Sequence, residues 1–284
     1  MVRVVTDSSC YLPADTLRKY NISVVPLKVQ FGEETLNEVT GISSQDFYRR
    51  LSTAQEVPTT SQPSAGEFRV AYQEILADNP DTAIIALTVS SKLSGTYNVA
   101  TTAATALPQA NITVFDSLSA ALGLGLMTIT AAEMAADGQL MADILKRLKQ
   151  MRHEISIVLM VESLEHLRRG GRIGTATAFL GTLLKTKPIL TIVEGEIKPL
   201  ERVRTKNRAM IRLIAELESK LTTPDQPVQA GVMHAAASAD METLVQMMRA
   251  HFNVTRLFAA EFGPVIGVHL GPGALGAGIC PEPD

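Results

Sequence analysis

The chain has 284 residues, 46% of them hydrophobic and 19% charged, with a formal net charge of -3 at pH 7. This length predicts two domains of ordinary size, each able to bury its own core. The slight acidic excess argues against a nucleic-acid-binding protein, which normally carries a strong basic excess. Because no apolar run reaches the roughly 18 residues that cross a bilayer, we expect no integral membrane association.

The two cysteines, Cys10 and Cys280, lie at opposite ends of the chain without CxxC spacing. This distribution indicates free thiols in a reducing compartment and argues against a zinc site. The N-terminal stretch MVRVVTDSS enters a strand pattern directly and lacks the layout of a signal peptide. We therefore expect a cytoplasmic protein that holds no metal.

In the first half of the chain, apolar strands run into polar turns and then into helices. Strands are predicted at residues 2–5, 22–31, 83–89 and 112–115, and helices at 13–20, 43–51, 65–77, 94–100, 119–136 and 139–151. This alternation predicts a mainly parallel sheet flanked by helices. Ligands bind at the carboxyl ends of such strands, where Asp7-Ser8-Ser9 lies in this chain.

A hydroxyl-rich turn with Ser90, Ser91 and Ser94 follows the third of these strands, and Gly95-Thr96 then opens a helix. Unpaired N–H groups and the positive end of the helix dipole make such a turn suitable for an anion. An ordinary N-cap serine after a strand explains the same residues.

A second hydroxyl-rich segment lies between Pro58 and Pro63, which bracket Thr59, Thr60, Ser61 and Gln62. The two prolines restrict the backbone, so we expect a stiff, non-helical loop. Ser64 and Glu67 then match a capping box at the start of a helix. A binding loop and a plain polar connection both fit this pattern.

The second half of the chain shows another α/β pattern. Strands are predicted at 155–160, 188–193, 196–203, 228–234 and 254–259, and helices at 162–167, 175–184, 206–221 and 240–250. Glu194-Gly195 joins two of the strands as a hairpin. We therefore predict a two-domain α/β fold, with a mainly parallel sheet in residues 1–152 and a mixed sheet in residues 153–284.

Basic side chains beside glycines stand out in this second half. Arg168, Arg169 and Arg172 surround Gly170-Gly171, and Arg204 belongs to a later basic cluster. Such a loop can contact phosphate or an acidic partner, and it can equally be a solvated helix end. His269 lies in a predicted apolar strand just before a Gly-Pro-Gly turn, where it is either a site residue or a satisfied core residue.

Motifs for several common chemistries are missing: the sequence contains no GxxxxGK[ST], HExxH or GxSxG, and GxGxxG occurs once, from Gly271 to Gly276. Six other segments are together more specific than any one alone, and they are spread over almost the whole chain in this order: Thr6–Pro13, Pro58–Ser64, Ser90–Tyr97, Phe115–Ser117, Leu167–Gly174 and His269–Gly273. Together they resemble the DegV family of fatty-acid-binding proteins.

The resemblance implies a two-domain α/β fold with one long-chain fatty acid, of the palmitate, stearate or oleate class, in a buried tunnel and no other cofactor. It implies a carrier rather than an enzyme. Some family members are the acyl-carrying subunit of bacterial fatty acid kinase. In that system a separate ATP-binding kinase subunit phosphorylates the bound carboxylate, and the acyl phosphate serves phospholipid synthesis.

The resemblance also assigns residues. Thr60 and Ser94 match the carboxylate-binding hydroxyls of the family. Arg172 and His269 match basic positions near the carboxylate and the incoming phosphoryl group, and Arg204 matches more weakly. The neighbouring ligand-binding candidates are Thr59, Ser61, Ser91 and Gly95. The chain departs from the family at Ser9 or Cys10, where Thr or Ala is more usual.

Two enzyme classes stay open as alternatives. A small-molecule hydrolase would use Ser94 with His269, although no triad acid is identifiable. A phosphate-binding enzyme would use the Ser94-Gly95-Thr96 helix start, although the sequence lacks a P-loop lysine motif. A third alternative is an interaction protein in which the arginine clusters serve only to dock a partner.

Overall fold

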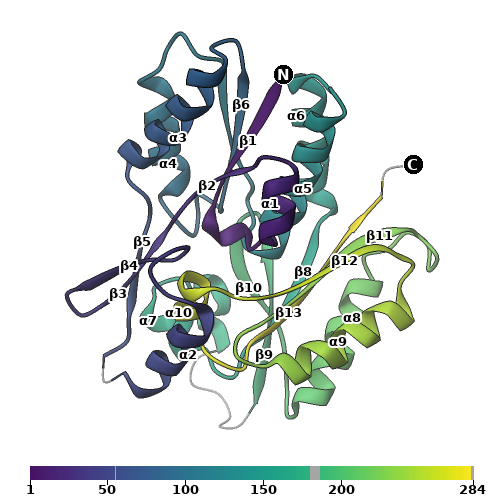
Figure 1. The fold of residues 1–284 in the computed structure, drawn as a ribbon. Coiled ribbons are helices and arrows are strands. Elements are labelled where there is room, and N and C mark those ends of the chain that lie inside the picture. The colour runs from purple at the N-terminus through teal and green to yellow at the C-terminus, as the bar shows by residue number, and fades with distance from the viewer. Residues whose placement is uncertain (55, 180–185, 283–284) are drawn as a thin grey trace.

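The computed structural model describes residues 1–54, 56–179 and 186–282. The first half of the chain is built around a parallel sheet and the second half around a mixed sheet (Figure 1). A small antiparallel sheet, which belongs to the first half, packs against the second half. The predicted α/β class, with a mainly parallel and then a mixed sheet, is confirmed.

The parallel sheet has the strand order β2-β1-β6-β7, and every pair in it is parallel. Its strands are β1 (Val2–Asp7), β2 (Ser23–Val25), β6 (Ala83–Thr88) and β7 (Ile112–Asp116). Because the chain leaves β1 toward β2 on one side and β6 toward β7 on the other, the carboxyl ends of β1 and β6 form a topological switch point. Ligand crevices open at such points.

Helices cover both faces of this sheet, as Figure 1 shows. They are α1 (Ala14–Lys19), α3 (Ala65–Asp78), α4 (Thr96–Thr105), α5 (Leu122–Ala136) and α6 (Met141–Glu154). Side chains alternate along a strand. Accordingly, Val5 packs with α3 and α4, whereas its neighbour Val4 packs with α5 and α6. The predicted capping box of Ser64 and Glu67 is present at the start of α3.

A three-stranded antiparallel sheet, ordered β4-β3-β5, interrupts the first half. It contains β3 (Lys28–Phe31), β4 (Glu34–Asn37) and β5 (Thr59–Ser61), and α2 (Ser44–Thr53) follows β4. The prediction of one strand over 22–31 was therefore wrong, since β2 and β3 belong to different sheets. The segment between the two prolines is non-helical as predicted, but it is a strand rather than a loop, because β5 pairs there with β3.

The second half is a six-stranded sheet with the order β10-β9-β8-β13-β11-β12, mixed because only β11 and β12 are parallel. Its strands are β8 (Ser156–Met160), β9 (Lys187–Val193), β10 (Glu196–Val203), β11 (Val228–His234), β12 (Val254–Glu261) and β13 (Leu275–Pro281). One face is covered by α8 (Lys206–Glu218) and α9 (Ser238–His251). The opposite face packs toward α5 of the first half.

Three short helical segments complete the second half: α7 (Glu165–Arg169), the 3-10 helix η2 (Gly174–Phe179) and α10 (Pro264–Leu270). The predicted strand around His269 is thus a helix, which begins with Pro264 in its first turn and ends at Gly271 with φ 73°. The predicted helix over 175–184 is observed only as η2, and residues 180–184 of that prediction lie outside the described residues.

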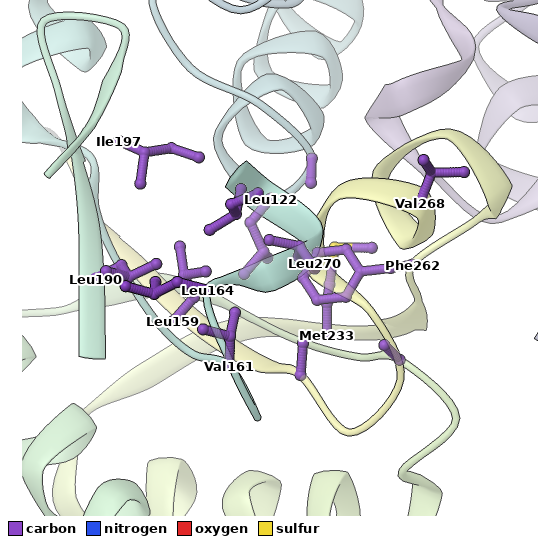
Figure 2. Packing of buried hydrophobic residues seen from close by; sticks show 14 of the residues in the cluster. Leu122, Leu159, Val161, Leu164, Leu190, Ile197, Met233, Phe262, Val268 and Leu270 are labelled. Carbon is purple, nitrogen blue, oxygen red and sulfur yellow. The ribbon is translucent and has the colours of Figure 1, made fainter. Parts of the chain in front are cut away.

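Between the two halves lies a buried apolar cluster, which Figure 2 shows from close by. Leu122 at the start of α5 meets Leu159 and Leu190 of the mixed sheet there, and Phe262, Val268 and Leu270 close it from the side of α10. The close approach has a local cause at Gly231 of β11, where an added Cβ would lie 2.0 Å from Leu122.

Candidate functional site

A cavity of about 340 Å³ lies where the two halves meet. Its size falls within the range of small-molecule sites, which are mostly apolar with a few polar groups. Six of the lining side chains, called here the apolar wall, come from both halves of the chain: Leu122, Ile157, Leu159, Ile192, Ile197 and Phe262. Several of them are labelled in Figure 2. The cavity reaches the switch point, because Ser9 and Val89 after β1 and β6 also line it.

Polar lining side chains, called here the polar end, come from β5 and its continuation, the turn before α4, the loop after α7, and α10. They are Thr60, Ser61, Gln62, Ser94, Arg172 and His269. Of the nine residues predicted to bind the ligand or support phosphoryl transfer, five therefore line the cavity, and Gln62 joins them.

Thr60 and Thr59 point to opposite sides of β5, as neighbours on a strand do. Thr60 Oγ1 lies 2.9 Å from His269 Nε2 and lines the cavity. Thr59 is exposed, and its hydroxyl donates to Gln30 Oε1 at 3.1 Å. The pairing of β5 with β3 thus selects Thr60 and turns Thr59 away from the cavity.

The turn after β6 presents Ser94 to the cavity, and Ser94 Oγ lies 2.8 Å from Thr96 Oγ1. Ser91 is held elsewhere, since its N–H donates to the Asp116 carboxylate at 3.1 Å. Gly95 also lies outside the lining, but a Cβ there would come within 2.1 Å of Gln62 Oε1. Its bare backbone allows the two predicted hydroxyl-rich segments to touch.

His269 is placed one helical turn after Val265 on α10, with its ring largely buried. Burial, the Arg172 charge and His166 lower the pKa of His269 to about 4, so its ring is neutral at pH 7. Among the described residues, Nδ1 has no hydrogen-bond partner. Gly170 packs against that nitrogen so closely that a Cβ there would lie 2.2 Å away.

The neutral His269 ring carries one proton, and the nitrogen that holds it determines whether the Thr60 hydroxyl can donate to a ligand. A proton on Nε2 lets the ring donate to Thr60 Oγ1, which leaves the threonine hydroxyl free to donate to a ligand. A proton on Nδ1 instead makes Nε2 the acceptor and occupies the hydroxyl. Binding an anion at Thr60 therefore favours the Nε2 tautomer.

Arg172 ties the second half of the chain to the turn before α4. Its Nε donates to Leu93 O at 3.1 Å and its Nη1 to Gly170 O at 2.6 Å. Both acceptors are neutral carbonyl oxygens, so the guanidinium charge is not cancelled by these contacts. Arg172 thus brings a positive charge beside neutral hydroxyl donors.

Arg204 lies apart from these residues. It follows β10, is exposed, and directly precedes Thr205, the N-cap of α8. It does not line the cavity. Its predicted role near an incoming phosphoryl group remains a prediction.

The floor of the site is organised by Asp7, the buried carboxylate at the end of β1. Asp7 Oδ1 accepts from the Ser9 N–H at 3.0 Å and from Ser9 Oγ at 2.5 Å, and Oδ2 accepts from the Val89 N–H at 2.7 Å. Burial raises the pKa of Asp7 against the effect of these hydrogen bonds. Asp7 therefore joins the carboxyl ends of β1 and β6.

Two residues at the site were missed by sequence reasoning. Gln62 stood inside the predicted loop, and its place between Ser61 and Pro63 was the available signal. Glu38, which contacts the start of α10, gave no signal, because its partner Val265 is 227 residues away in the chain.

The hydrolase alternative gains no support from this geometry. His269 Nε2 contacts Thr60, and Ser94 Oγ is engaged with Thr96. The described part of the chain contains no group of three or more His, Cys, Asp or Glu side chains arranged to hold a metal ion. In that same part, every helix is too short or too polar to cross a bilayer.

Comparison with known proteins agrees with this geometry. The model of the DegV family matches residues 1–282. Protein DegV of Bacillus subtilis is 37% identical over 280 residues, covering 98% of this chain and 99% of that protein. The solved structure of a fatty-acid-binding DegV family protein from Thermus thermophilus has a TM-score of 0.93 at 32% identity, covering 99% of both chains. The structure of DegV from Bacillus subtilis, described as a fatty acid binding protein, has a TM-score of 0.89 at 36% identity and covers 99% of both chains.

Proposed function

This chain belongs to the DegV family, and on that premise we propose that it binds one long-chain fatty acid, tail along the apolar wall and carboxylate at the polar end. The observation that carries the proposal is a cavity with an apolar wall and clustered neutral donors, centred on the 2.9 Å contact of Thr60 with His269. The fatty acids described for the Thermus thermophilus and Bacillus subtilis proteins support it.

The wall supplies the affinity in this proposal. Burying an acyl chain of about sixteen carbons releases about 0.8 kcal/mol per CH₂, or roughly 12 kcal/mol before the costs of association. Lost translational freedom and chain ordering offset much of this, which leaves a dissociation constant on the order of nM to μM. Palmitate, stearate and oleate are the ligand classes of this size.

Neutral donors at the polar end set the orientation of the ligand. A buried carboxylate without partners is very unfavourable, so Thr60, Ser94 and the nearby Ser61 hydroxyl satisfy it. Because Arg172 is engaged with carbonyl oxygens, it attracts the carboxylate without forming a bidentate ion pair. The carboxylate oxygen keeps its nucleophilicity.

We extend the proposal to a carrier role in the cytoplasm, where Cys10 and Cys280 stay free thiols. In this role the chain performs no chemistry alone and presents its ligand to an ATP-dependent fatty acid kinase subunit. The carboxylate oxygen attacks the γ-phosphorus of ATP, the bond to ADP breaks, and an acyl phosphate forms. Arg172 and Arg204 support the transferring group electrostatically, and neutral His269 contributes through its hydrogen bond with Thr60.

The binding proposal is tested by extracting the purified protein and identifying the co-purified lipid by mass spectrometry, with oleate titrations on Thr60→Ala, Ser94→Ala and Thr59→Ala. We expect a bound long-chain acid and about tenfold weaker oleate binding for the first two variants, because each removes a donor to a charged group.

Thr59→Ala is the matched control, since its hydroxyl faces Gln30 on the far side of β5. It should bind oleate as the unaltered protein does. Equal affinity in all three variants would show that the carboxylate lies elsewhere, and absence of a lipid together with no oleate binding would overturn the function itself.

The carrier role is tested with a purified fatty acid kinase subunit, ATP and labelled oleate. Arg204→Glu should lower acyl phosphate formation and leave oleate affinity unchanged, because Arg204 is exposed outside the cavity. Unchanged acyl phosphate formation would exclude Arg204 from this step.

A further inference from the structure

Glu38, the residue after β4, is a carboxylate in the interior, with only 7% of its surface exposed. Its two oxygens accept three hydrogen bonds from neutral donors. Tyr11 Oη at 2.7 Å and the Val265 N–H at 2.8 Å donate to Oε1, and Ser8 Oγ at 2.5 Å donates to Oε2. Burial raises the pKa of Glu38 against the effect of these donors.

Two of these donors, Ser8 and Tyr11, also accept hydrogen bonds from residues that line the cavity. Ser8 Oγ accepts from the Leu27 N–H at 2.9 Å, and Tyr11 Oη accepts from the Ile266 N–H at 3.2 Å. Leu27, Val265 and Ile266 all line the cavity. One carboxylate thus fixes two segments of the cavity lining that are far apart in the sequence.

The start of α10 depends on these contacts. A helix of seven residues is too short to be stable alone, so tertiary contacts decide where it lies. The N–H groups of its first turn have no partner within the helix, and Glu38 and Tyr11 accept from two of them. At Gly263, just before the helix, a Cβ would lie 2.5 Å from Tyr11 and 3.0 Å from Glu38.

A shift at the start of α10 reaches the polar end directly. His269 follows Val265 by one helical turn, and its ring is confined between Thr60 and Gly170. We propose that Glu38 is a positioning residue for the carboxylate site, which holds α10 so that His269 meets Thr60. This inference rests on the proposed fatty-acid binding, and Glu38 itself touches no ligand atom in it.

Substitution by glutamine changes one atom of this network. In Glu38→Gln, Oε1 can still accept from Tyr11 and Val265, but an amide nitrogen replaces Oε2. The amide nitrogen can only donate, so the Ser8 hydroxyl, which also accepts from Leu27, loses the acceptor for its own proton. The side chain or Ser8 must move, and the start of α10 moves with them.

The experiment measures oleate affinity in variants that distinguish a displaced His269 from a general loss of protein stability. Ile214→Val is the stability control, because Ile214 lies on α8 in the core on the far side of the mixed sheet. We expect about tenfold weaker oleate binding for Glu38→Gln. Ile214→Val should bind oleate as the unaltered protein does, even where its Tm is as low as that of Glu38→Gln. The imidazole ¹⁵N resonances of His269 should shift in Glu38→Gln alone.

Double variants identify the route. If Glu38 acts through His269, Glu38→Gln in a His269→Gln background should cost no further affinity, whereas its effect should multiply with that of Ser94→Ala, which lies off α10. Multiplying losses with His269→Gln, or unshifted His269 resonances, would overturn the inference. If Glu38→Gln does not fold, Tyr11→Phe removes one donor to the same carboxylate and takes its place.

Failure of the inference and failure of the proposed function give different results. Normal oleate binding by Glu38→Gln, together with weakened binding by Thr60→Ala, rejects only the role of Glu38. Absence of oleate binding by the unaltered protein rejects the function on which it rests.

Discussion

Side chains of the apolar wall hold one another by packing, whereas those of the polar end are held by individual hydrogen bonds. Leu122, Leu159 and Phe262 interdigitate across the junction of the two halves. Thr60, by contrast, meets His269 at 2.9 Å, and Arg172 is fixed by two carbonyl oxygens. Packing tolerates exchange of one apolar residue for another of similar size. A hydrogen bond, by contrast, is lost when the donor or the acceptor moves out of a narrow range of distance and angle.

The wall and the polar end should therefore respond differently to substitution. Changes in the wall act through the volume left for the ligand and should depend on acyl chain length. Changes at the polar end act on one contact at a time and should be the same for every acyl chain. Three measurements test this contrast.

The largest effect is expected from filling the cavity beside the apolar wall at Gly276, a lining residue of β13, where a Cβ would lie 3.2 Å from Phe262. Gly276→Leu adds four side-chain carbons and should displace about four methylenes of the acyl chain, which corresponds to roughly 3 kcal/mol, or more than a hundredfold loss of affinity for palmitate. Laurate, shorter by four carbons, should keep its affinity. Titration of both acids is the measurement.

Ala277→Val is the control for that variant, since Ala277 faces α8 and α9 on the other side of the sheet. It overpacks the same strand without entering the cavity. Equal losses for palmitate and laurate in Gly276→Leu would mean that the wall does not measure chain length.

An intermediate effect is expected from pH at the polar end. Because the pKa of His269 is lowered from 6.5 to about 4, the unfolded chain binds more protons than the folded one between these values. Stability therefore falls on acidification through this window, by about 2 kcal/mol between pH 7 and pH 5 from this group. Urea unfolding of the unaltered protein and of His269→Gln at both pH values measures the difference.

The raised pKa values of Asp7 and Glu38 act with the opposite sign, since stability from a carboxyl that is more basic in the folded protein is lost as pH rises. Both groups are present in the two proteins and cancel in the comparison. An equal pH dependence in both would show that His269 is not buried in its neutral form.

The smallest effect is expected from substituting two adjacent glycines, one of which should change oleate affinity and the other only stability. Gly170→Ala places a methyl group against His269 Nδ1 and should weaken oleate binding about fivefold, the value of about 1 kcal/mol for one hydrogen bond. Gly171 has φ 69° with open space around its Cα, so Gly171→Ala should cost about 1 kcal/mol of stability and no affinity. Calorimetry of both variants checks the pair, and a loss of affinity in Gly171→Ala would contradict it.

Local patterns in the sequence predicted most elements of the fold. Strands β1, β6 and β7 of the parallel sheet, the hairpin at Glu194-Gly195 and the capping box at Ser64 follow from neighbouring residues and are present. Elements decided by distant partners were missed. Three-residue β5 is a strand because β3 pairs with it, and Gly-rich β13 is a central strand because β8 and β11 flank it.

The site residues show the same difference between local patterns and contacts with distant partners. Of the nine residues assigned with the resemblance to the DegV family, five line the cavity, namely Thr60, Ser61, Ser94, Arg172 and His269. Sequence alone did not separate Thr60 from Thr59, because only the pairing of β5 decides which hydroxyl faces inward. No local pattern marks Glu38, whose donors are 27, 30 and 227 residues away.

The shared wall of the cavity has a consequence for the abundance of the protein. Because neither half encloses the cavity alone, a ligand inside it joins the two halves and adds to the free energy of unfolding in proportion to the logarithm of its concentration. Empty molecules open more often and are cleaved sooner by proteases. On the proposed function, we therefore expect the steady-state level of the protein to rise with the concentration of its fatty acid in the cell.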